Sequence, residues 1–198
     1  MHKPETIAKY LLHLAAQSPE ACPITHLQLQ KLMYYVQGWS LAWTGQPMFR
    51  GEIQAWEHGP VVASLYPRLK KFGAKPLPKH GDSAASTLTP DERRRIESVW
   101  GRYGQYSAPH LREMTHKETP WREARAGLKE GEPSRAVISQ ESMRAYFRKE
   151  YEAWCKKECG CTVEELEQSI RDARSGNTVP LDSLRPARGE RGTERVAG

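Results

Sequence analysis

The sequence has no long hydrophobic run and few cysteines. No stretch approaches the roughly 20 consecutive apolar residues of a membrane-spanning helix. Residues 1–17 have the spacing of an amphipathic helix and lack the continuous apolar core of a signal peptide. The 4 cysteines fit reduced thiols better than a secreted disulfide framework. We therefore expect a cytoplasmic protein without a membrane span.

The sequence also lacks the local motifs of several enzyme classes. It contains no G-x-S-x-G elbow, no G-x-G-x-x-G or P-loop, and no HExxH, so nucleophilic catalysis, nucleotide binding and zinc hydrolysis lack their usual signatures. We expect no catalytic residues and no cofactor. The net charge of +6 is spread along the chain and no helix-turn-helix is recognisable, which argues against direct nucleic-acid binding.

The clearest local pattern lies between Thr25 and Val62. Thr25 and Gln28 have the spacing of a capping box at a helix start. Behind them, apolar residues recur at helical steps: Leu29, Leu32, Met33, Val36 and Trp43. Gly45 and Pro47 then end the pattern. These signals predict a central helix that is buried on much of its circumference.

A period close to two follows the central helix and predicts a short strand or hairpin between Phe49 and Trp56. Gly59 can adopt a positive φ, and Pro60 suits the first position of a helix, so we expect a third helix from Val61 to about Phe72. Helix-start residues with apolar periodicity behind them predict further helices after Thr89, Ser107, Thr119, Ser139 and Thr162. The expected fold class is mainly α: a compact multi-helix domain with a small β-strand or hairpin element, plus C-terminal helices and a disordered tail.

Two groups of short sequence motifs occur together in this chain. The first group is Leu29-Gln30-Lys31-Leu32-Met33-Tyr34-Tyr35, Gly45-Gln46-Pro47-Met48-Phe49, Ile53-Gln54-Ala55-Trp56 and Gly59-Pro60-Val61-Val62; the second is Tyr103-Gly104, Ser107-Ala108, Leu111, Thr115-His116, Thr119-Pro120-Trp121 and Ala124-Arg125. In this order and spacing they resemble the Panacea antitoxin domain family, also described as SocA-like or phage-associated proteins. The resemblance covers roughly residues 1–147.

The resemblance implies an antitoxin of a toxin-antitoxin system that binds and neutralises a cognate toxin protein encoded beside it. It also implies an alternative, a proteolytic adaptor that delivers a toxin to a protease, and it implies no known catalytic residues. We expect residues 1–147 to form the domain, 148–175 a C-terminal helical extension and 176–198 a disordered tail. The helix expected from Thr162 to about Arg174 is largely polar, and it could take part in forming a homo-oligomer.

Histidines and cysteines suggest two metal hypotheses. His58, His110 and His116 could build a metal-dependent enzyme, but His110 and His116 are six residues apart, which does not place both on one metal from a single helix. We favour a local hydrogen bond of His116 near the turn at Thr119. A second set, Cys155, Cys159 and Cys161, resembles a partial zinc site that would need a fourth ligand such as His13 or Cys22, but we favour free thiols and expect no bound metal.

Binding is the remaining class of function. Tyrosine and tryptophan are enriched at interface hot spots, and the chain has 8 tyrosines and 6 tryptophans. Lys31 and Tyr35 lie one helical turn apart and are predicted to flank the apolar stripe. Together with Trp56 and His58 they form the predicted partner-binding set.

Overall fold

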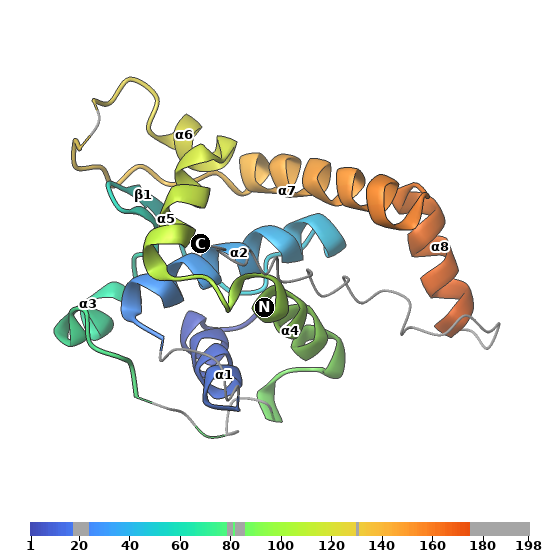
Figure 1. The fold of residues 1–198 in the computed structure, drawn as a ribbon, viewed down its shortest axis with the longest axis horizontal. Helices are drawn as coiled ribbons and strands as arrows, with labels where there is room; N and C mark the ends of the chain where they lie inside the picture. Colours follow the sequence, from blue (N-terminus) through green and yellow to red (C-terminus); the bar gives the residue numbers. More distant parts are fainter. Residues whose placement is uncertain (18–23, 79–80, 82–85, 130, 175–198) are drawn as a thin grey trace, which may run out of the picture. The chain divides into compact units, whose positions relative to one another are not determined.

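The computed structural model describes residues 1–17, 24–78, 81, 86–129 and 131–174, and the predicted disordered tail lies outside them. Its α-helices are α1 Pro4–Gln17, α2 His26–Thr44, α3 Tyr66–Leu69, α4 Pro90–Tyr103, α5 Ala108–Lys117, α6 Thr119–Ala124, α7 Gln140–Trp154 and α8 Val163–Arg174 (Figure 1). Strands β1 Ile53–Trp56 and β2 Gly59–Val62 form a two-stranded antiparallel sheet. The predicted fold class, mainly α with a small hairpin and C-terminal helices, is confirmed.

The chain divides into two compact units, Met1–Lys149 and Glu150–Gly198. The domain boundaries expected from the sequence, after residues 147 and 175, stay predictions. In the described part of the second unit, a π-helical turn over Cys155–Cys159 precedes α8. No helix in the described ranges is long and apolar enough to cross a membrane.

Helix α2 is the centre of the first unit, and α1, α4, α5 and β2 pack around it (Figure 1). Its ends follow the predicted signals. The Thr25 side chain accepts a hydrogen bond from the Gln28 backbone N–H, and Gly45 closes the helix at φ 69°. The Gln28 side chain does not complete the predicted capping box. It donates to the Tyr106 carbonyl at 2.9 Å, because the segment after α4 packs against the start of α2.

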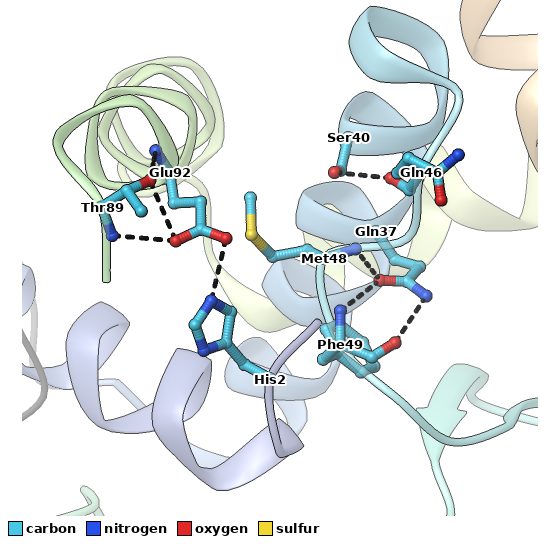
Figure 2. Close-up of polar contacts among 8 residues, drawn as sticks. All are labelled: His2, Gln37, Ser40, Gln46, Met48, Phe49, Thr89 and Glu92. Atoms are coloured by element: carbon cyan, nitrogen blue, oxygen red, sulfur yellow. Dashed lines mark hydrogen bonds and ion pairs between the residues drawn. The ribbon is translucent and has the colours of Figure 1, made fainter. Parts of the chain in front are cut away.

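The buried polar side chains of α2 hold the loops that surround the helix. Gln37 is 1% exposed. Its Oε1 accepts hydrogen bonds from the backbone N–H groups of Met48 and Phe49, and its Nε2 donates to the Phe49 carbonyl (Figure 2). Ser40 donates to the Gln46 carbonyl at 2.9 Å. Side chains of α2 thus satisfy backbone groups of Gln46, Met48 and Phe49, of which Met48 and Phe49 are buried.

Replacing Gln37 by alanine should lower the free energy of unfolding by about 2 kcal/mol, because three buried backbone groups lose their partners. Urea unfolding followed by far-UV circular dichroism would measure the change. Gln105→Ala is the matched control, since Gln105 is exposed and its loss should change stability by less than about 0.5 kcal/mol. Equal effects of the two substitutions would contradict this role of Gln37.

The hairpin differs from prediction after its turn. The register pairs Trp56 with Gly59, so Glu57 and His58 form a two-residue turn, and Gly59 has φ 93°. The predicted helix from Val61 is wrong, because Gly59–Val62 continues the sheet and helical structure starts only at Tyr66. Pro60 lacks an N–H, but its carbonyl is used, as it accepts a hydrogen bond from Lys31.

Gly38 of α2 allows an aromatic ring to lie against the helix backbone. A Cβ at Gly38 would come within 2.1 Å of Cε2 of Phe147. The Phe147 ring also makes edge contacts with Tyr34 and Trp39, at centroid separations of 5.6 and 5.4 Å. Phe147 is only 1% exposed, so its ring is part of the core of the first unit.

The N-terminus is tied to α4 through Glu92 (Figure 2). Thr89 and Glu92 form a capping box at the predicted helix start, and the other carboxylate oxygen of Glu92 lies 2.9 Å from Nε2 of His2. Burial raises the pKa of Glu92, but the hydrogen bonds from Thr89 and His2 outweigh it and hold the pKa below its usual value. The ion pair joins two segments that are far apart in the sequence.

Candidate functional site

Two of the four residues predicted to bind a partner lie inside the protein. Lys31 is 1% exposed and Tyr35 is fully buried, so neither forms surface in this structure, contrary to the prediction that they flank the apolar stripe. Helices α1, α4 and α5 and strand β2 pack around α2, so its polar side chains are buried together with its apolar ones. Trp56 is half-buried and His58 is exposed. Their role in partner binding stays a prediction.

Lys31 binds the backbone of the hairpin from inside the protein. Its Nζ donates to the Pro60 carbonyl at 3.1 Å. A Cβ at Gly59 would lie 2.8 Å from Cε of Lys31 and 2.9 Å from Oγ1 of Thr115, so the hairpin turn, α2 and α5 meet at close contact. Burial, followed by the positive charge of Arg112, lowers the pKa of Lys31 to about 7.

Tyr35 has a different structural role. Its hydroxyl donates to Oε1 of Glu118 at 2.9 Å, and its ring stacks on Tyr103 at a centroid separation of 3.9 Å. Burial and the adjacent Glu118 carboxylate raise the pKa of Tyr35 far above its usual value. This contact joins α2 to the junction between α5 and α6.

The surface beside the hairpin is built by the end of α5 and by α6. The rings of His116 and Trp121 stack at a centroid separation of 3.9 Å and an interplanar angle of 9°. Trp121 Nε1 donates to the carbonyl of Trp56 at 3.0 Å, which ties α6 to the hairpin turn. Arg125 approaches the Trp121 ring to 5.1 Å and donates to the Ala55 carbonyl.

We call the set His58, Arg112, His116 and Trp121 the hairpin face. His58 and Arg112 are exposed, and His116 and Trp121 are half-buried. Burial, followed in order by the neighbouring Arg112, Lys31, Arg125 and His58, lowers the pKa of His116 to about 4. At neutral pH the His116 imidazole is therefore uncharged, while the arginines around it are cationic.

The expected hydrogen bond of His116 at the Thr119 turn is absent from the hydrogen bonds among the described residues. Its Nε2 is buried and has no hydrogen-bond partner there, and the ring is held by stacking on Trp121. The sequence reasoning missed Arg112 and Trp121 as members of a surface set. One signal was present, because Arg112 and His116 are four residues apart on one helix and therefore share a face.

The two metal hypotheses find no support in the geometry of the described residues, which contain no group of three or more His, Cys, Asp or Glu side chains placed to hold a metal ion. His110 is exposed and stacks on Tyr106 at 4.6 Å. Cys155 is buried whereas Cys159 is exposed. Cys22, a suggested fourth ligand, lies outside the described residues.

Comparison with known proteins agrees with the sequence resemblance. Residues 29–122 match the family model described as Antitoxin SocA-like, Panacea domain. A curated protein, antitoxin SocA of Caulobacter vibrioides (strain NA1000 / CB15N), is 38% identical over 69 residues, which are 35% of this chain and 36% of that protein. The match thus spans about a third of the relative, and no solved structure matches. Residues 29–122, which contain the hairpin, the hairpin face and all but the first three residues of α2, therefore resemble the SocA-like Panacea family.

Proposed function

We propose that this protein is the antitoxin of a toxin-antitoxin system and that it neutralises a cognate toxin in the cytoplasm by direct protein–protein contact. The observation that carries the proposal is the match of residues 29–122 to the SocA-like antitoxin family. The name of the curated relative, antitoxin SocA, supports the same class of function.

Neutralisation by contact requires only a difference in affinity. The antitoxin covers the active site of the toxin, or it binds an inactive state more tightly than the active one and shifts the population toward that state. The hairpin face suits such contact, because it combines an exposed arginine with half-buried aromatic rings. Tryptophan, tyrosine and arginine dominate the binding energy of protein interfaces.

Co-expression tests the proposal. The genes adjacent to that of this protein should be expressed one at a time, alone and together with the full chain, while growth is followed. One neighbouring protein should stop growth when it is alone, should permit growth in the presence of this chain, and should co-purify with it in near-stoichiometric amount. If no neighbour is toxic, or if growth recovers without a complex, neutralisation by contact is wrong.

The same purification distinguishes the adaptor alternative. Protease subunits recovered together with the toxin, and a toxin half-life that shortens when the chain is present, would indicate delivery for degradation. Removal of Gly176–Gly198 should then abolish degradation and preserve toxin binding. Under direct neutralisation, the truncated chain should protect growth as well as the full chain does.

A further inference from the structure

The hairpin face carries more positive than negative charge in its immediate surroundings. Its arginine neighbours come from separate elements: the exposed Arg112 from α5 and the buried Arg125 from the segment after α6. The close contact at Gly59 and the hydrogen bond from the Trp121 indole N–H to the Trp56 carbonyl hold these elements together. The positive charges are therefore fixed around one small surface, and the folded core does not let them separate.

Two acidic residues close to this surface in the chain, Glu118 and Glu57, point elsewhere. Glu118 is 7% exposed and its carboxylate accepts the hydroxyl of Tyr35 inside the protein. Oε1 of Glu57 lies 4.0 Å from the position that a Cβ at Gly131 would take, so this carboxylate faces the loop after α6.

His116 adds a buried ring nitrogen that makes no hydrogen bond to the described residues. Its Nε2 is buried without a hydrogen-bond partner among the described residues. A buried polar atom without a partner costs free energy. The stacked indole of Trp121 fixes the ring, so the imidazole stays at this position beside the exposed guanidinium of Arg112.

We propose that the hairpin face binds an acidic side chain of the toxin, with Arg112 and His58 contacting the carboxylate and the stacked rings of His116 and Trp121 forming the floor of the site. The inference rests on the proposed function, since it names the chemistry by which the antitoxin recognises its partner. A carboxylate accepts the paired N–H donors of an arginine in a planar, charge-assisted geometry. The surrounding cations favour this acidic group over a basic one.

Binding of a carboxylate has a consequence for His116. In the free protein, burial and the neighbouring Arg112, Lys31, Arg125 and His58 hold the pKa of His116 at about 4. A bound negative charge favours the protonated imidazole and raises that pKa. Complex formation should therefore be accompanied by a rise in the titration midpoint of His116, and binding should strengthen as the pH falls toward the raised pKa.

The first test uses the captured toxin and the full chain. Arg112→Glu should weaken binding at least about tenfold in isothermal titration calorimetry, because it places like charges together. Arg112→Gln should have a smaller effect in the same direction. Arg144→Glu is the matched control, since Arg144 is an exposed helical arginine on α7. A toxin that binds all variants equally would overturn the inference and leave the proposed function standing.

The second test does not require the toxin. A hexaglutamate peptide at millimolar concentration should shift the Trp121 indole N–H resonance of the full chain and raise the titration midpoint of the His116 ring. A hexalysine peptide should do neither. If the acidic peptide leaves both resonances unchanged, the site is wrong. If it binds while no neighbouring protein is toxic, the acidic-group site stands and the proposed function fails.

Discussion

Substitution of Gly38 by alanine is expected to destabilise the protein by about 3 kcal/mol, the upper end of the usual cost of overpacking a core. The new Cβ would lie 2.1–2.7 Å from three atoms of the Phe147 ring, which cannot retreat without losing its contacts with Tyr34 and Trp39. Helix propensity alone predicts the opposite sign, a gain of about 1 kcal/mol over glycine. Chemical denaturation in urea would measure the change.

Gly101 provides the matched control for this prediction. It also lies in a helix, α4, but a Cβ there would meet nothing within 4 Å. Gly101→Ala should therefore stabilise the protein by about 0.5–1 kcal/mol, as propensity requires. The double substitution Gly38→Ala with Phe147→Leu should cost less than the sum of the two single substitutions, because the smaller side chain frees the space. Additive costs would show that the ring does not press on Gly38.

The second large effect is a dependence of stability on pH that comes from Lys31. Its pKa is about 7 in the folded protein and 10.5 when it is unperturbed. Between these values the unfolded chain binds more protons than the folded one, so the free energy of unfolding rises with pH. The slope is at most about 1.4 kcal/mol per pH unit, and the whole gain is on the order of 4 kcal/mol. Below the folded pKa the charged lysine is buried and stability is lowest.

Lys31→Met should remove most of this rise, because methionine fills a similar volume without a titrating group. Urea midpoints between about pH 7 and 9 would show it, in the range below the usual ionisation of tyrosine. Lys9→Met is the control, since Lys9 is exposed and the same cysteines and tyrosines remain in both variants. If wild type and Lys31→Met keep parallel pH profiles, Lys31 is charged in the folded protein throughout this range.

Much of the helical framework could be predicted from short-range patterns. The caps at Thr25 and Thr89 and the terminator at Gly45 act on backbone groups within one turn, so they can be identified without any knowledge of the fold. The same is true of β1, where the alternation of Ile53 and Ala55 with polar neighbours follows the pleat. The family resemblance likewise depended on short sequence motifs in a given order.

The continuation of the hairpin through Pro60 could not be predicted in this way. Locally, a proline after glycine suits a helix start. In the folded protein, however, residues 59–62 pair with β1 and pack on α2, where Gln30 accepts a hydrogen bond from the Val62 N–H and Lys31 donates to Pro60. Partners about 30 residues away in the sequence outweigh the local preference.

The sequence alone therefore determined where most helices begin and end, the mainly α class and the resemblance to the SocA-like family, because these depend on capping, on periodicity and on the order of short motifs. Only the tertiary structure decided that Lys31 and Tyr35 are buried and that Arg112, His116 and Trp121 form a surface with His58. Helical periodicity predicts one apolar stripe, but helices pack on several sides of α2 and bury its polar positions as well. These long-range contacts decide which residues are buried. They therefore also decide which residues remain exposed to a partner.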